Sequence, residues 1–241
     1  GAMGLWNVLA PLLKAQPGHV MRWTPRDFHA DALPRISNEC CHSLLMPPLH
    51  TLPILDPLSP QPQRLRNFVA NGNVLVVTGG IFAVEFLNKY FFLRLDPAPG
   101  SYTAKGWPIA KGAEEIGFAA GPQEVSNDAA RVFPVREASL PEGSHVLWGA
   151  NQLAAVAMMT FCERPSDDPR DPFVVEKPSQ CAPKGPSSRG GGAGGCSCGD
   201  ILLLLNDFNT PDAPWKAVLR HAIEYGAQNT PSSSSSSSSS S

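Results

Sequence analysis

The chain has 241 residues, of which 42% are hydrophobic, and its 19 basic and 21 acidic side chains leave a formal net charge of -2. A chain of this length is large enough to bury a core of ordinary domain size. The nearly balanced charge gives no electrostatic footprint for nucleic acid. The longest apolar runs, at 73–77 and 201–205, have the length of strands, whereas roughly 20 residues are needed to cross a bilayer. We therefore expect neither nucleic acid nor a membrane as a partner.

The composition predicts a single α/β domain over residues 4–228 with low-complexity additions. Residues 1–3, Gly-Ala-Met, are typical of the remnant that protease cleavage of an expression tag leaves behind. Residues 165–199 are rich in Gly, Pro and Ser and lack apolar periodicity, which predicts a disordered insertion. Residues 229–241 are mostly serine, and we expect them to form a disordered tail.

The first half of the chain alternates helical and strand patterns. Apolar residues at helical spacing predict a helix over 5–15, and a short extended piece follows at 19–23. The apolar run at 43–46 is typical of a buried parallel strand. Residues 63–70 predict a helix, and after a glycine turn residues 74–77 form the clearest strand pattern of the chain. Helix, turn and buried strand are half of a βαβ unit.

The second half predicts more strands. Thr78-Gly79-Gly80 breaks the strand pattern, and helical spacing resumes over 81–92. We expect residues 96–121 to be irregular. Short strands are predicted at 131–135, 145–148 and 154–161, the last two joined as an antiparallel hairpin by a turn at Asn151-Gln152. A buried strand at 200–205 and a closing helix at 215–225 complete the expected domain.

The order of these elements resembles the class I glutamine amidotransferase-like superfamily, particularly its ThuA-like and other non-amidotransferase branches. The resemblance rests on residues 65–80, where a helix and a glycine turn precede a strand and Thr78-Gly79-Gly80, and on residues 199–207 followed by a helix that begins at Trp215. It implies a flavodoxin-like three-layer α/β sandwich with a mainly parallel sheet, an antiparallel hairpin excursion and a disordered loop.

The catalytic residues of that superfamily have no counterpart here. In its catalytic members a cysteine nucleophile stands at the turn after the central strand, and a His and a Glu two residues apart follow the last strands. The matching turn at 77–81 has no cysteine, and the matching segment at 206–209 has no histidine. A thiol needs a base within reach, and Cys162 has no such motif around it. We therefore expect no catalytic residues and no cofactor, and we interpret the domain as an inactive protein-interaction or scaffold module of a larger protein.

The alternative is a small-molecule- or sugar-binding hydrolase or isomerase. Open α/β sheets bind ligands in the crevice at the carboxyl ends of their strands, and backbone N–H groups at the start of a helix bind anions. Thr78 is also a possible nucleophile in this alternative. We favour a structural interpretation of both turns, because glycines allow a tight turn and Asn or Asp side chains cap loops and helices. The candidate ligand-binding residues are Thr78, Gly79, Gly80, Asn206, Asp207 and Asn209.

Aromatic residues predict an interaction surface. Phe and Tyr residues are dense between 82 and 92 and cover more than one stripe of the expected helix. Some of these side chains are therefore expected on a second, exposed face, and exposed aromatic patches mark partner surfaces. The candidate surface consists of Phe82, Tyr90, Phe91, Trp107 and Trp148.

The six cysteines do not predict a disulfide framework, because such frameworks occur in shorter, cysteine-denser chains. We expect free thiols and a cytoplasmic or other reducing intracellular compartment. Cys196 and Cys198, with Cys181 upstream, raise the alternative of a metal- or redox-responsive loop. Their C-x-C spacing is not a zinc knuckle, and no nearby His completes four ligands, so we expect no metal site. We interpret Cys40-Cys41 as small buried apolar residues.

Overall fold

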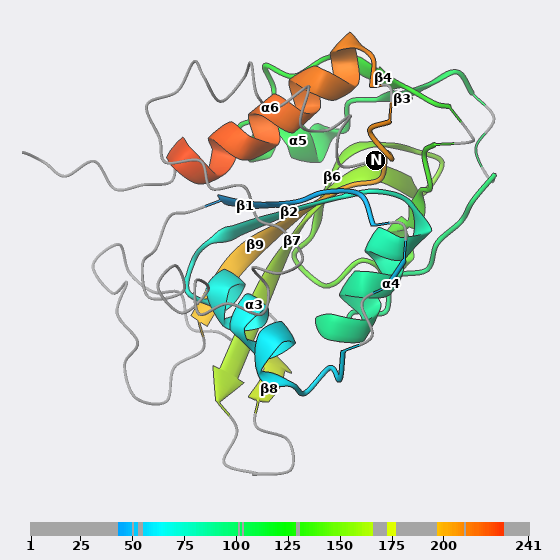
Figure 1. The fold of residues 1–241 in the computed structure, drawn as a ribbon. Helices are drawn as coiled ribbons and strands as arrows, with labels where there is room; N and C mark the ends of the chain where they lie inside the picture. Colours follow the sequence, from blue (N-terminus) through cyan, green and yellow to red (C-terminus); the bar gives the residue numbers. More distant parts are fainter. Residues whose placement is uncertain are drawn as a thin grey trace, which may run out of the picture.

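The computed structural model describes residues 43–49, 51–52, 55–100, 102, 104–128, 131–165, 173–176, 197–209 and 211–228. The helix expected at 5–15, the extended piece at 19–23, Cys40-Cys41, most of the insertion and the serine tail lie outside the described residues. The described chain has a mixed α/β fold, in which helices cover both faces of one large sheet (Figure 1).

Three parallel strands form one half of the sheet, in the order β1-β2-β9. They are β1 (Ser43–Met46), β2 (Val74–Thr78) and β9 (Ser197–Leu204). Every residue of β2 is buried, as expected for an apolar strand covered on both faces. The strands predicted at 43–46 and 74–77 are confirmed. The last strand begins earlier than predicted, inside the segment interpreted as a disordered insertion.

The other half of the sheet is antiparallel, so the expectation of a mainly parallel sheet is wrong there. Strand β7 (Leu153–Pro165) pairs antiparallel with β9 and also with β5 (Val135–Arg136), β6 (His145–Ala150) and β8 (Phe173–Glu176). The predicted β6–β7 hairpin is confirmed. Its turn residues Asn151 and Gln152 both have positive φ, as a two-residue type I′ turn requires. Such a turn forces β6 and β7 to run in opposite directions, because parallel strands need a long crossover.

Helices α3 (Pro60–Ala70) and α4 (Ile81–Tyr90) cover one face of the sheet, and α6 (Ala213–Gln228) with the short α5 (Lys111–Glu115) covers the other (Figure 1). Successive residues of β9 serve two cores because side chains alternate along a strand. Leu203 belongs to the core under α3 and α4, and Leu204 to the core under α6. Among the residues that the structure describes, no helix is long and apolar enough to cross a membrane.

The stretch 96–121 is not wholly irregular as expected, because it contains α5 and the first strand of a small second sheet, whose other strand follows at 124–126. Strands β3 (Gly106–Pro108) and β4 (Glu124–Ser126) pair antiparallel, and a 3-10 turn, η2, covers Glu137–Ser139. Trp107 of β3 is fully buried and stacks on Tyr102 with ring centroids 3.8 Å apart. Its indole Nε1 donates to Oδ1 of Asn127 at 3.1 Å. Strands of three residues are too short to produce a readable apolar alternation, which is why the sequence did not predict them.

Candidate functional site

The carboxyl ends of β2 and β9 meet at one edge of the sheet, where the candidate crevice was predicted. Thr78 is in register with Leu204, and the Gly79 N–H donates to the Leu204 carbonyl oxygen at 3.1 Å. After β9 the chain remains near this edge. Asn206 forms a β-bridge with Val132, and the next residue, Phe133, lies beside Gly80. The turn at 78–80 and the turn at 206–209 therefore lie at the same edge.

Thr78 holds β1 and β2 together. Its Oγ1 donates to the carbonyl oxygen of Met46 at 2.8 Å, and the residue is completely buried. Nucleophilic catalysis requires a hydroxyl that can reach substrate and pass its proton to a base. The Thr78 hydroxyl instead gives its proton to a backbone carbonyl in the closed interior, so its role is structural.

The two glycines form a tight turn. Gly79 has a φ of +132°, a conformation that other residues rarely adopt. A Cβ atom at Gly80 would lie 2.6 Å from Cδ2 of Phe133. Binding of an anion at the start of a helix needs open space in front of the backbone N–H groups. At the start of α4 the ring of Phe133 occupies the space beside Gly80.

The turn at 206–209 is held together by its own side chains. Asn206 is buried, and its Oδ1 accepts from the Phe208 N–H at 2.7 Å. Asp207 Oδ1 accepts from the Asn209 N–H at 3.0 Å, and its Oδ2 accepts from Asn209 Nδ2 at 2.8 Å. Asn and Asp side chains stabilise turns in this way. The candidate ligand residues thus share one edge of the sheet, but the polar side chains among them bind the chain itself.

Four of the aromatic residues predicted to form a surface belong to the core instead. Tyr90, Phe91, Trp107 and Trp148 are each at most 1% exposed, and Phe82 is half-buried. Phe91 packs edge-on against Phe161 of β7 with ring centroids 5.0 Å apart. Large rings bury much apolar area, and a buried indole N–H needs a partner, which is the Asn127 side chain for Trp107 and the Pro122 carbonyl oxygen for Trp148. The predicted surface is therefore wrong for these four side chains.

The aromatic side chain that does face solvent is Phe92, directly after α4. Phe92 is 42% exposed and Leu58 is 48% exposed, the two large exposed apolar side chains of the described chain. Arg66 links the two segments that carry them: its guanidinium carbon is 5.4 Å from the Phe92 ring centroid, and its Nη1 donates at 3.1 Å to the carbonyl oxygen of Pro57, the residue before Leu58. We name the surface formed by Leu58 and Phe92 the 58/92 surface.

A buried charge pair lies beneath the 58/92 surface. Arg66 Nε is 3.8 Å from Oε1 of Glu163, Arg66 is fully buried, and Glu163 is 5% exposed. Arg66 also donates to the carbonyl oxygen of Tyr90 at 2.8 Å. Burial raises the pKa of Glu163 to about 7, and the positive charge of Arg66 opposes part of that rise. The pair joins α3, the end of α4 and β7 under the exposed side chains.

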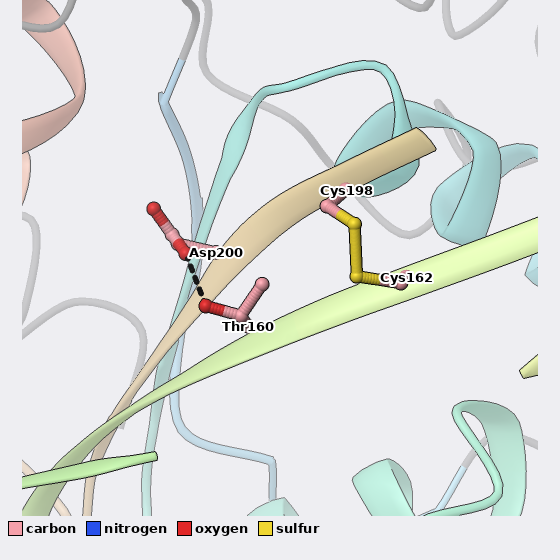
Figure 2. The surroundings of a disulfide bond; sticks show 4 residues. All are labelled: Thr160, Cys162, Cys198 and Asp200. Atoms are coloured by element: carbon pink, nitrogen blue, oxygen red, sulfur yellow. Dashed lines mark hydrogen bonds between the residues drawn. A yellow bond between two sulfur atoms is a disulfide. The ribbon is translucent and has the colours of Figure 1, made fainter. Parts of the chain in front are cut away.

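A disulfide bond joins Cys162 of β7 to Cys198 of β9 (Figure 2). The expectation of free thiols is wrong for these two residues. They are directly opposite each other in the antiparallel pair, with Cα atoms 4.1 Å apart. Such a bond is typical of oxidising environments and does not fit the expected reducing compartment well. Cys181 and Cys196 lie outside the described residues.

Polar side chains follow the disulfide on the same face of the sheet. Thr160 Oγ1 donates to Asp200 Oδ1 at 3.2 Å, two residues along the strands from the cysteines (Figure 2). Tyr225 of α6 donates through its hydroxyl to Asp200 Oδ2 at 3.2 Å. Burial raises the pKa of Asp200, and the two hydrogen bonds and His145 oppose that rise. This cluster ties β7, β9 and α6 together.

A surface cavity of about 240 Å³ lies beside α6. Glu224 contributes its one carboxylate, whose Oε1 accepts from Nε of Arg220 at 2.7 Å. This carboxylate is therefore already paired with a guanidinium of the same helix. The cavity is lined by Ile116, Gly117, Phe118, Ala120, His221, Glu224 and Tyr225.

Comparison with known proteins found no matching family model, no matching curated protein and no matching solved structure. Within the described ranges, no group of three or more His, Cys, Asp or Glu side chains is placed to hold a metal ion.

Proposed function

We propose that this domain is a non-catalytic, amidotransferase-like module that binds another protein through the 58/92 surface. The observation that carries the proposal is that the polar side chains at the carboxyl ends of β2 and β9 form hydrogen bonds within the chain. The groups concerned are the hydroxyl of Thr78, the amide of Asn206 and the carboxylate of Asp207. A reaction requires side chains that are free to contact substrate.

The relationship to the amidotransferase-like superfamily is part of the proposal. Three features support it: the parallel order β1-β2-β9, the glycine turn between β2 and α4, and the helices on both faces of the sheet (Figure 1). A flavodoxin-like origin accounts for the parallel half, and the antiparallel half is then an elaboration on it. A nucleophile must be exposed to substrate, so a turn that has lost its nucleophile can bury the residue at that position. Burial of Thr78 and the Phe133 ring beside Gly80 agree with that loss.

The 58/92 surface has the features of a binding surface. Phe92 has a φ of 55°, which is unusual for a bulky residue and is more often seen where structure serves function. Its backbone conformation places a phenyl ring at the surface over a buried arginine. Aromatic side chains in such positions are common anchors of protein interfaces.

Charge beside the surface narrows the chemistry of the partner. The Lys89 ammonium is 5.1 Å from the Tyr90 ring centroid, and the Tyr90 hydroxyl accepts from the Leu55 N–H at 3.4 Å. Lys89 therefore lies near Leu55, whereas the charge beside Leu58 is negative, because Asp56 Oδ1 accepts from the Leu58 N–H at 2.9 Å. An apolar side chain of a partner would cover Phe92 and Leu58, and a carboxylate beside it would complement Lys89.

Affinity capture with quantitative mass spectrometry tests the proposal. The immobilised chain is compared with a double variant, Leu58→Ser with Phe92→Asn, because asparagine tolerates the positive φ at position 92. The matched control is Asn209→Ser, which changes the exposed residue of the crevice. We expect a stoichiometric protein that is lost with the double variant and kept with the control. Capture lost with the control and kept with the double variant would instead favour ligand binding at the crevice.

Turnover assays with amide, ester and glycoside substrates provide the second arm of the test. The proposal expects no turnover above that of a heat-unfolded sample. Turnover that falls when Thr78 is changed to Ala would contradict it, because it would require the buried hydroxyl to act in the reaction.

A further inference from the structure

The Cys162–Cys198 bond lies inside a sheet that other interactions hold in register. The ladder between β7 and β9 pairs Val156 with Leu204 and continues as far as Glu163 with Ser197. Cys162 is also paired with Glu176 of β8, so hydrogen-bonded strands flank it on both sides. The cysteine backbones are therefore positioned by the sheet as well as by the sulfur–sulfur bond.

The neighbouring polar cluster adds a second restraint on the same face. Thr160 and Asp200, two residues along their strands from the cysteines, form a cross-strand hydrogen bond (Figure 2). Tyr225 of α6 donates to the same carboxylate. If the disulfide is reduced, these contacts remain. The two thiols then stay opposite each other at a high effective concentration, a condition that favours re-formation of the bond.

The two cysteines of the disulfide differ in their exposure to solvent. Cys162 is completely buried, whereas Cys198 is partly exposed. Thiol–disulfide exchange begins with attack by a thiolate on one of the two sulfurs, and access decides which sulfur is attacked. An external thiol therefore reaches Cys198 first, and Cys162 is the leaving group.

We propose that Cys162 and Cys198 are a reversible dithiol–disulfide couple that exchanges with an external thiol such as glutathione through Cys198. The external thiolate attacks the Cys198 sulfur and forms a mixed disulfide, and the bond to Cys162 breaks to release a thiolate that takes a proton from water. A second external thiolate then attacks the external sulfur of the mixed disulfide, the bond from that sulfur to Cys198 breaks, and the released Cys198 thiolate takes a proton from water. The couple gains two electrons and two protons, and the two external thiols leave as their own disulfide. This redox site goes beyond the proposed binding function and does not depend on it.

Equilibration of the native chain in glutathione buffers of stepped redox ratio tests the couple. Exchange is stopped with acid and free thiols are then alkylated in the unfolded chain, so that the buried Cys162 also reacts. The peptides that contain Cys162 and Cys198 are quantified by mass spectrometry, and far-UV circular dichroism before the acid step follows the fold. We expect both residues to become alkylated over the same range of ratios, to re-form their bond when the ratio is reversed, and to leave the dichroism spectrum unchanged. A bond that opens only after denaturant is added would overturn the proposal, because it would show a purely structural disulfide.

Two single variants test the assigned direction of attack. In Cys162→Ser the remaining Cys198 thiol is expected to take up glutathione from its disulfide form. In Cys198→Ser the remaining Cys162 thiol is buried, and we expect its alkylation to be slower by a factor on the order of ten or more. Equal rates in two folded variants, or glutathione attached to Cys162 in preference to Cys198, would overturn the assignment of Cys198 as the attacked residue.

Discussion

The buried carboxyl of Glu163 predicts a stability that falls as pH rises. Its pKa is about 7 in the folded protein against an ordinary value of 4.5, because burial disfavours the charged form. A carboxyl with a raised pKa binds its proton more tightly in the folded state than in the unfolded state. Its contribution is fully present below pH 4.5 and is lost as pH rises through 7. Between pH 5 and pH 8 the two pKa values correspond to a loss of about 2.5 kcal/mol in the free energy of unfolding.

Urea unfolding of the wild type and of Glu163→Gln at several pH values between 5 and 8 measures this contribution. Glutamine is isosteric with the protonated carboxyl and does not titrate, so the difference in unfolding free energy between the two proteins isolates Glu163. We expect that difference to move by about 2.5 kcal/mol in favour of the variant as pH rises from 5 to 8. Asp200 also has a raised pKa, but its contribution is present in both proteins and cancels.

Glu85→Gln is the matched control, because Glu85 is an exposed glutamate of α4. Its unfolding free energy should follow the wild type at every pH. If the difference between wild type and Glu163→Gln stays constant from pH 5 to pH 8, the reasoning is refuted, because Glu163 would then be ionised throughout and held so by Arg66.

Three further substitutions test the structural roles assigned to single residues, each by urea unfolding followed through tryptophan fluorescence. Thr78→Val should lower the unfolding free energy by about 1 to 3 kcal/mol, because it leaves the buried Met46 carbonyl without its donor, whereas Thr78→Ser should keep most of the stability. Gly79→Ala should cost about 1 to 3 kcal/mol because of the positive φ at that position. Asn127→Ala should cost at least about 1 kcal/mol, since its side chain bonds to the Trp107 indole and to two backbone carbonyls. Losses below about 0.5 kcal/mol, the usual range for surface substitutions, would contradict these assignments.

The parts of the fold that the sequence predicts best are those with local signals. The apolar run of β2 and the glycine turn after it are adjacent in the sequence, so both their type and their position follow from a short window. The β6–β7 hairpin is similar, because the Asn151-Gln152 turn separates its two strands. The sequence also predicts that the turns at 78–80 and 206–209 lie close together, since the carboxyl ends of neighbouring parallel strands share one edge of the sheet.

The remaining features depend on the register of distant segments. Cys162 and Cys198 are separated by 36 positions, and only the pairing of β7 with β9 places them opposite each other. Burial of Arg66 against Glu163 depends on the packing of α3 over β7. The residues around a helical arginine in the sequence do not indicate whether its side chain is buried. The exposed Phe92 differs from the buried Phe91 by one position, and the end of α4 at Tyr90 decides which ring faces solvent.

The most direct test of the proposed binding function is a hydrogen–deuterium exchange footprint of the chain with its captured partner. We predict slower exchange at residues 55–59 and 90–94, around Leu58 and Phe92, and unchanged exchange at 78–80 and 205–209. Protection confined to 78–80 and 205–209 would contradict it, because the crevice at the carboxyl ends of β2 and β9 would then be the binding site.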